Sequence, residues 1–218
     1  MKYKNKSIQI SCDGGAATGK STGAKMIANK YKLKFLSSGL LYRYASFLIL
    51  KYKPKKELIF LKTKFRKLNY KQLEKINLHS QKISEYSAVL AKKNEIRKIL
   101  KKFQIKFSTK NKNCCIEGRD ISTKILPNSD IKFYFKCNLT IAAKRRYKEL
   151  KKLDAKIELK NVKKALRTRN ILDTSRKHSP LLKHRNSVEI DTGKLNKQAM
   201  LKKMSKYVEK VLLEKYGN

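Results

Sequence analysis

A loop suited to binding phosphate groups lies near the start of the chain. Residues 14–21 read G-G-A-A-T-G-K-S and fit the pattern G-x-x-x-x-G-K-[ST] in full. Glycines let such a backbone curl so that successive N–H groups face a phosphate, and the following helix adds its positive N-terminal end. Lys20 is expected to reach the β- and γ-phosphates, and Ser21 to offer its hydroxyl to Mg²⁺. The predicted nucleotide-binding residues are Gly14, Gly15, Ala16, Ala17, Thr18, Gly19, Lys20, Ser21 and Thr22.

The segments on either side of this loop support the prediction. Residues 7–12 alternate polar and apolar side chains, as a strand does, and residues 20–31 place Ala24, Ile27 and Ala28 on one helical face. A strand running into the loop and a helix running out of it is the arrangement that binds a nucleoside triphosphate. We therefore expect a nucleoside triphosphate to bind here together with Mg²⁺.

The rest of the chain alternates strands with helices. Strands are predicted at 34–36, 113–116, 130–137 and 187–190, and helices at 40–50, 139–152, 161–170 and 194–216. Such alternation implies βαβ units and hence a parallel sheet covered on both faces. The sequence predicts an α/β fold with five parallel strands between two layers of helices.

Residues 51–112 depart from this alternation. They contain helical segments near 70–75 and 81–103 and no clear parallel strand. We interpret this stretch as a mostly helical insertion over the carboxyl edge of the sheet. An ordinary run of crossover helices is the alternative.

Two arginines follow the second and third predicted strands. Arg43 and Arg119 come just after the carboxyl ends of these strands, the edge where ligands of open α/β sheets bind. A bidentate guanidinium there can clamp the phosphate of an acceptor in line with the γ-phosphate of ATP. Asp120, next to Arg119, has three possible roles: holding Mg²⁺ through water, orienting arginines, or capping a helix.

The charge of the chain admits two interpretations. The formal net charge is +40, which by itself suggests a nucleic-acid binder. However, only ten of the 56 basic residues are Arg, and Lys is a solvated point charge where Arg is a bidentate ligand for phosphate. Compositional drift towards Lys is therefore favoured over a dedicated nucleic-acid surface, with non-specific RNA association expected only at low salt.

Composition excludes several other classes of protein. The chain is 40% hydrophobic and 9% aromatic, which is unlike a disordered or collagen-like sequence. No apolar stretch approaches the roughly 20 residues that a membrane span needs. The four cysteines lack the spacing of metal ligands. We expect a cytoplasmic protein without a membrane partner.

Several further segments carry a family resemblance. They are the loop at 13–22, S-S-G-L-L-Y-R at 37–43, E-G-R-D-I-S-T at 117–123 with L-P-N-S at 126–129, the spaced residues Arg169, Asp173, Arg176, Pro180 and Leu181, and V-E-I-D-T at 188–192. In this order they resemble the bacterial cytidylate kinases, a branch of the nucleoside monophosphate kinases. The resemblance covers nearly the whole chain.

The resemblance implies a fold, a domain organisation and an activity. It implies a P-loop NTPase core at 1–50 and 105–218, with a nucleoside monophosphate (NMP)-binding insertion at 51–104 and a short lid at about 145–165. The implied activity is phosphoryl transfer from MgATP to CMP or dCMP, giving ADP and CDP or dCDP, by a monomer. The implied catalytic residues are Lys20, Arg119, Asp120, Arg145 and Arg146. The implied substrate-binding residues are Ser38, Tyr42, Arg43, Arg97, Glu117, Arg119, Arg169, Asp173 and Arg176.

The distribution of arginine supports these assignments independently. Seven of the ten arginines, at positions 43, 97, 119, 145, 146, 169 and 176, fall on the implied site. This is expected if drift replaced Arg by Lys wherever a point charge suffices but not where a planar, bidentate group is required.

Five positions depart from the family pattern. Gly15 and Ala17 stand where Pro and Gly are usual, and Ala17 is unfavourable if that position needs a positive φ. Ser37 replaces an Asp, and Ala142 replaces an Arg at the start of the lid. Ala88 stands where a Ser contacts the base, so acceptance of UMP beside CMP and dCMP stays undecided.

Two other functions are compatible with parts of the sequence. One is another P-loop small-molecule kinase, acting on UMP, an adenylate or a shikimate-like substrate. The other is a basic RNA-binding protein with a vestigial P-loop, which predicts RNA affinity that falls steeply with salt and no transferase activity.

Overall fold

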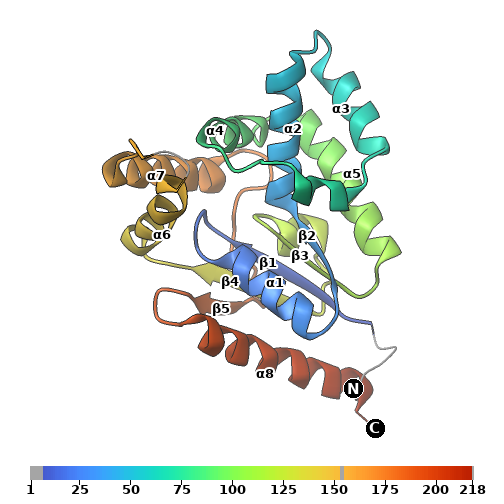
Figure 1. The fold of residues 1–218 in the computed structure, drawn as a ribbon. Helices are drawn as coiled ribbons and strands as arrows, with labels where there is room; N and C mark the ends of the chain where they lie inside the picture. Colours follow the sequence, from blue (N-terminus) through green and yellow to red (C-terminus); the bar gives the residue numbers. More distant parts are fainter. Residues whose placement is uncertain (1–6, 153–154, 218) are drawn as a thin grey trace.

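A five-stranded parallel sheet forms the centre of the molecule (Figure 1). The computed structural model describes residues 7–152 and 155–217. The strand order is β2-β3-β1-β4-β5, and every neighbouring pair is parallel. The strands are β1 (Gln9–Gly14), β2 (Lys34–Ser37), β3 (Cys114–Gly118), β4 (Ile131–Lys136) and β5 (Val188–Asp191). All five predicted strands are confirmed.

Helices cover both faces of this sheet, which confirms the three-layer α/β/α fold. Helices α1 (Lys20–Lys30) and α8 (Lys197–Tyr216) share one apolar core with Cys115 and Phe133. On the opposite face, α2 (Ser38–Tyr52) and α5 (Asn94–Lys110) pack against Cys114 and Ile116. Successive residues of β3 thus point to opposite layers, as the pleat of a strand requires.

A smaller apolar cluster lies beside the phosphate loop. Helices α6 (Leu139–Lys151) and α7 (Leu159–Ser175) pack together there, and Ala16 of the loop joins their contact. Helix α7 extends beyond the predicted bounds of 161–170 in both directions, and the helix predicted at 194–216 begins at Lys197. Among the described residues, no helix combines the length and apolar character that a membrane span requires.

The segment at 51–112 is helical, but its elements differ from the prediction. It contains α3 (Glu57–Arg66), a 3₁₀ helix η1 (Tyr70–Lys75), α4 (Gln81–Leu90) and α5. The expected single helix at 81–103 is wrong, because the chain turns at Ala91–Lys93, where Lys93 adopts an extended backbone. No Gly or Pro marks this break. The Tyr70 hydroxyl accepts a hydrogen bond from the Ser37 N–H at the end of β2, so the segment does reach the carboxyl edge of the sheet.

A buried carboxylate connects β1 to the turn that follows β3. Asp13 is 1% exposed, and its two oxygens accept the N–H groups of Ile121 and Ser122 at 2.8 and 2.7 Å. The Ser122 hydroxyl adds a third bond, at 2.6 Å. These bonds hold the one-turn π-helix η2 (Ile121–Ile125) and with it fix the chain immediately after Arg119 and Asp120.

Candidate active site

The phosphate loop has the backbone geometry that an anion cradle needs. It runs from the end of β1 to Gly19, which caps α1 with a φ of 75°. At Gly14, a Cβ atom would lie 2.4 Å from the carbonyl oxygen of Phe135 on β4, so only glycine fits there. Ala17 has a φ of 56°. The position does require the left-handed region, and the chain places an alanine in it.

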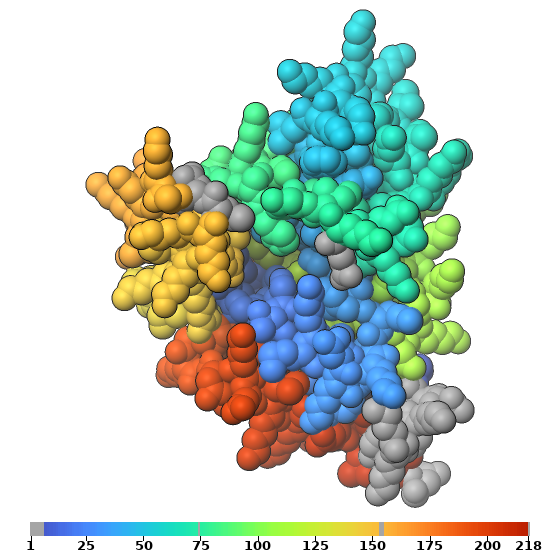
Figure 2. Space-filling view, in the orientation of Figure 1, coloured from blue at the N-terminus to red at the C-terminus, as the bar shows by residue number. Residues whose placement is uncertain are grey.

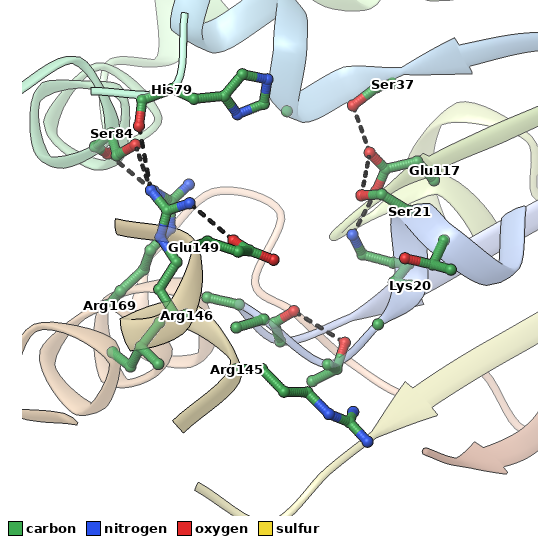
Figure 3. Close-up of a pocket in the computed structure, with 18 of the residues that line it drawn as sticks. Lys20, Ser21, Ser37, His79, Ser84, Glu117, Arg145, Arg146, Glu149 and Arg169 are labelled. Carbon is green, nitrogen blue, oxygen red and sulfur yellow. Dashed lines mark hydrogen bonds and ion pairs between the residues drawn. The ribbon is translucent and has the colours of Figure 1, made fainter. Parts of the chain in front are cut away.

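The Glu117 carboxylate organises the side chains at the base of this loop (Figure 3). One of its oxygens accepts from the Lys20 ammonium, and the other from the hydroxyls of Ser21, at 3.1 Å, and Ser37. Lys20 and Glu117 are 6% and 2% exposed. Burial alone would raise the pKa of the Glu117 carboxyl, but Lys20, Ser37 and Arg119 together lower it to about 2. The carboxylate is therefore ionised at neutral pH and holds Lys20 and Ser21 side by side.

A large cavity extends from this loop across the carboxyl edge of the sheet. Its volume is about 1450 Å³, and the space-filling view shows the surface hollowed between α1, α4 and α6 (Figure 2). The cavity is lined by the phosphate loop, by α2 and α4, and by residues of α6 and α7. The walls of the cavity therefore come from elements that lie far apart in the sequence.

Arg43 on α2 and Arg146 on α6 both line this cavity, and Arg43 has little charge compensation. Arg43 donates from Nη1 to Nδ1 of His79 at 2.8 Å, and no carboxylate of the described chain forms an ion pair with it. Burial and the nearby Arg146 lower the pKa of Arg43 to about 10. Arg146 donates to the His79 carbonyl and to Ser84, and pairs with Glu149 at 3.0 Å. The arrangement favours an anion arriving between the two guanidiniums.

Asp173 on α7 holds a second group of arginines. Its carboxylate accepts from Arg119 Nε at 2.7 Å and from Arg176 Nη1 at 3.4 Å, and lies 3.9 Å from Arg169 Nε. Burial would raise the pKa of Asp173, but Arg119 and Arg169 lower it below its usual value. Burial and Arg119 also lower the pKa of Arg169 to about 10. One carboxylate thus lies close to three guanidiniums, so this group of side chains carries a net positive charge.

A smaller pocket of about 30 Å³ lies behind these arginines. Asp120 pairs there with Arg97, whose guanidinium lies 5.8 Å from the centre of the Tyr42 ring. Of the roles considered for Asp120, contact with an arginine is what the structure shows, and its side chain makes no capping hydrogen bond. Arg176 Nη2, which borders this pocket, and Arg169 Nε are buried without a hydrogen-bond partner in the described part of the chain. Such donors need an acceptor, which a ligand can provide.

The residues predicted from the sequence therefore fall into two sets. The large cavity is lined by residues 15–22 of the loop with Arg43, Glu117, Arg119, Arg145, Arg146 and Arg169. The small pocket is bordered by Ser38, Tyr42, Arg97, Arg119, Asp120, Arg169, Asp173 and Arg176. Gly14 lines neither and acts through its contact with Phe135. Facing anion sites in one sheltered cavity suit phosphoryl transfer, which needs positioning and dispersed positive charge.

Arg145 does not point where the sequence suggested. Its guanidinium donates to the Thr192 hydroxyl at 3.0 Å and to the Thr192 carbonyl at 2.7 Å. In Figure 3 it points away from Lys20 and Glu117. This geometry therefore does not support the role expected for Arg145 at the transferring phosphoryl group.

Sequence reasoning missed several residues that the structure brings to the site. Ser37 bonds Glu117, His79 bonds Arg43, and Ser84 bonds both Arg146 and, through its carbonyl, Arg169. Asn170 accepts the Ala16 N–H at 3.1 Å. Ser37 was visible only as a departure from the family pattern, and His79 and Ser84 follow no motif in this chain.

Comparisons with known proteins agree on one family. A family model described as cytidylate kinase matches residues 10–210. A cytidylate kinase from Clostridium tetani is 31% identical, with 96% of this chain and 97% of that protein covered. A cytidylate kinase from Bartonella quintana is 34% identical, with coverages of 90% and 92%. The crystal structure of an uncharacterized protein from Eubacterium ventriosum, 16% identical, superimposes with a TM-score of 0.55 over 93% of this chain and 98% of that one, which supports the fold alone.

The left-handed backbone at Ala17 predicts that Ala17→Gly stabilises the protein. Relief of the left-handed penalty, less the backbone entropy of glycine, amounts to about 1 kcal/mol, or a rise in Tm of about 2–4 °C. Thermal unfolding followed by circular dichroism measures this change. As a control, Ala24→Gly inside α1 should lower the Tm, since that residue is helical and buried. A fall in Tm for Ala17→Gly would show that the left-handed backbone of Ala17 does not destabilise the protein.

The depressed pKa of Glu117 predicts a specific pH dependence of stability. A carboxyl whose pKa falls from 4.5 to about 2 on folding stabilises the native state above its unfolded pKa, and this stabilisation is lost as the pH falls towards 2. The free energy of unfolding of Glu117→Gln should therefore be lower than that of the wild type by about 3 kcal/mol at neutral pH, and by much less at about pH 3.

Urea unfolding at several pH values measures this difference. Glu209→Gln, which removes an exposed partner of Lys30, is the matched control and should change stability by less than about 0.5 kcal/mol throughout. A Glu117→Gln deficit that stays constant with pH would show that the carboxyl is not held in the ionised form.

Proposed function

This chain belongs to the cytidylate kinase family, and from that membership we propose that it transfers the γ-phosphoryl group of ATP to CMP and dCMP, giving ADP and CDP or dCDP. The observation that carries the proposal is the single cavity that joins the phosphate loop to a group of under-compensated arginines. Such a cavity can hold two phosphate-bearing ligands with their reacting ends facing each other.

ATP binds at the phosphate loop in this proposal. The N–H groups of residues 14–22 and the N-terminus of α1 surround its phosphates, and Lys20 transfers from Glu117 to the β- and γ-phosphate oxygens. Ser21 and Glu117 present oxygen atoms 3.1 Å apart, a hard donor pair of the kind that Mg²⁺ prefers. When bound, Mg²⁺ neutralises phosphate charge. Glu117 then remains anchored by Ser37.

The acceptor phosphate binds among the arginines of the large cavity. Arg43 exchanges the neutral His79 nitrogen for a phosphate oxygen, which is the stronger, charge-assisted partner. Arg119 and Arg146 approach the same region from β3 and α6, so that positive charge surrounds the phosphoryl group during transfer. No covalent chemistry by the protein is required, because phosphoryl transfer depends on positioning and charge.

In this proposal the base of CMP contacts the groups that border the small pocket, which at about 30 Å³ is itself too small to enclose a base. Arg97 and Arg176 offer only donors, and Asp120 offers only acceptors. The Watson–Crick edge of cytosine carries both complements, since N3 and O2 accept while the N4 amino group donates. Uracil replaces that amino group with a carbonyl oxygen, which a carboxylate repels. Asp173 and Arg169 are proposed to hold the ribose, and Ser38 and Tyr42 border this part of the site.

The proposed domains follow from these roles. Residues 1–50 and 105–218 form the kinase core, 51–104 the NMP-binding insertion, and about 145–165 a lid, of which 153–154 lie outside the described residues. Contacts of Arg146 and Arg169 with Ser84 on α4 connect the lid region and α7 to the insertion across the cavity. Closure of these parts on both substrates would exclude water from the reaction.

We further propose that the enzyme is a cytoplasmic monomer. The monomer follows from the resemblance to the cytidylate kinases, and the nucleotide substrates are cytoplasmic metabolites. In this proposal the +40 charge attracts anionic nucleotides, and RNA associates non-specifically only at low salt.

The choice of acceptor base tests the proposal directly. In a coupled assay of ADP release with MgATP, CMP and dCMP should give the highest kcat/KM, with UMP lower by at least about tenfold and AMP lowest. Asp120→Asn should lower turnover of CMP and narrow the ratio of CMP to UMP, because an amide can donate to the uracil carbonyl. Equal rates with CMP and UMP would contradict the base assignment, and no turnover with any acceptor would refute the kinase.

The shape of the arginine side chain provides a second test. Arg43→Lys keeps the charge but loses bidentate binding, so kcat/KM for CMP should fall by roughly tenfold or more. Arg66→Lys, at an exposed position on α3, is the matched control and should change kcat/KM by less than about twofold. Wild-type kinetics of Arg43→Lys would show that a point charge suffices at this position.

A further inference from the structure

We propose that Thr192 is a positioning residue that fixes the phosphate loop for the nucleotide donor, and that Arg145 acts through Thr192 rather than on the transferring phosphoryl group. The inference rests on the proposed function only in naming the donor, since the contacts belong to the loop itself. It follows from hydrogen bonds at a place where β4, β5, α6 and the phosphate loop meet.

Thr192 is held on two sides. It is the first residue after β5, is 3% exposed, and donates its N–H to the Lys136 carbonyl at the end of β4 at 3.0 Å. On its other side, its hydroxyl donates to the Thr18 carbonyl in the phosphate loop at 2.7 Å. A Cβ atom at Gly19 would lie 3.5 Å from this same side chain. Thr192 therefore lies close to the loop as well as being bonded to it.

The hydrogen bond to Thr18 matters because of how a phosphate loop works. Its N–H groups must point inward at the anion, so its carbonyl oxygens must point outward, where each needs a donor. The Thr18 carbonyl receives the Thr192 hydroxyl, and the Gly15 carbonyl receives the Thr18 hydroxyl at 3.1 Å. A Thr18 carbonyl without this donor could turn towards the phosphates and repel them.

Arg145 determines the direction of the Thr192 hydroxyl proton. The guanidinium donates to the hydroxyl oxygen at 3.0 Å and to the carbonyl oxygen of the same residue at 2.7 Å. A hydroxyl has one proton, and its oxygen is now an acceptor for Arg145. The proton is left for the Thr18 carbonyl at 2.7 Å in preference to the Lys136 carbonyl at 3.4 Å. This explains why a planar, two-pronged arginine stands at 145 in a lysine-rich chain.

Isosteric variants of Thr192 test the first half of the proposal. Thr192→Val keeps the shape and removes the hydroxyl, whereas Thr192→Ser keeps the hydroxyl. Titration calorimetry with MgADP, without any acceptor, should show affinity about tenfold lower for Thr192→Val and within about twofold of wild type for Thr192→Ser. The KM for CMP should stay within about twofold in both. Thr109→Val, an exposed threonine of α5 with its own helical hydrogen bond, is the matched control and should bind MgADP normally.

Variants of Arg145 test the second half. Arg145→Met should weaken MgADP binding and leave kcat at saturating ATP within about twofold, because a positioning role affects binding of the donor. In the double variant Arg145→Met/Thr192→Val, the loss of MgADP affinity should not exceed the loss in Thr192→Val alone by more than about twofold. A large fall in kcat for Arg145→Met, or losses that multiply in the double variant, would place Arg145 at the reacting group and overturn the inference.

The outcomes separate this inference from the proposed function. Normal MgADP affinity of Thr192→Val overturns the role of Thr192 even if the wild type phosphorylates CMP. Absence of CMP phosphorylation by the wild type refutes the function while the ADP titrations still decide the role of Thr192. If Thr192→Val does not show a cooperative thermal transition, Arg145→Met and Arg145→Lys replace it in the titration. Both variants are expected to bind MgADP more weakly than the wild type. Normal MgADP binding by both would overturn the inference.

Discussion

The site depends on one buried carboxylate at the end of β3. Glu117 is shared by Lys20 and Ser21 at the start of α1 and by Ser37 at the end of β2. Because the sheet is parallel and β1, β2 and β3 are neighbours, the loops that leave their carboxyl ends meet at one edge. A carboxylate there is stable only while cationic and hydroxyl donors surround it, so the position of Glu117 constrains where the phosphate loop and α2 begin.

The remaining charges of the site are unbalanced, and this has a direct physical meaning. Asp173 is shared among Arg119, Arg169 and Arg176, while the one partner of Arg43 in the described part of the chain is a neutral histidine nitrogen. Burial without enough negative charge lowers the pKa of Arg43 and Arg169. The protein therefore bears an electrostatic cost in the absence of ligand that anionic substrates relieve. Folding energy is in this way stored at the place where phosphates bind.

The positions of the strands and the phosphate loop were predictable because they follow from local patterns. Alternation of polar and apolar residues marked the first strand, short apolar segments marked the other four, and the glycines of the loop required a particular backbone. The break at Ala91–Lys93 was not predictable, since neither Gly nor Pro marks it and only packing on α2 and α7 separates α4 from α5. The partner of Arg145 was also hidden, because residues 145 and 192 meet only when β4 and β5 pair. Motifs identified which residues matter, but not which atoms each one touches.

The division of labour between lysine and arginine has a consequence for covalent chemistry. Reagents that attack primary amines, whether acetyl donors or labelling compounds, find many targets on the surface of this chain. Among the described residues, the large cavity itself is lined by arginines and also by lysines, namely Lys20, Lys25, Lys148, Lys164 and Lys197. Lys20 of the phosphate loop is 6% exposed and paired with Glu117, so such reagents have little access to its amino group, although burial lowers its pKa. The protein can therefore lose much of its surface charge to acylation while Lys20 stays sheltered and the arginines, which such reagents do not attack, keep their charge.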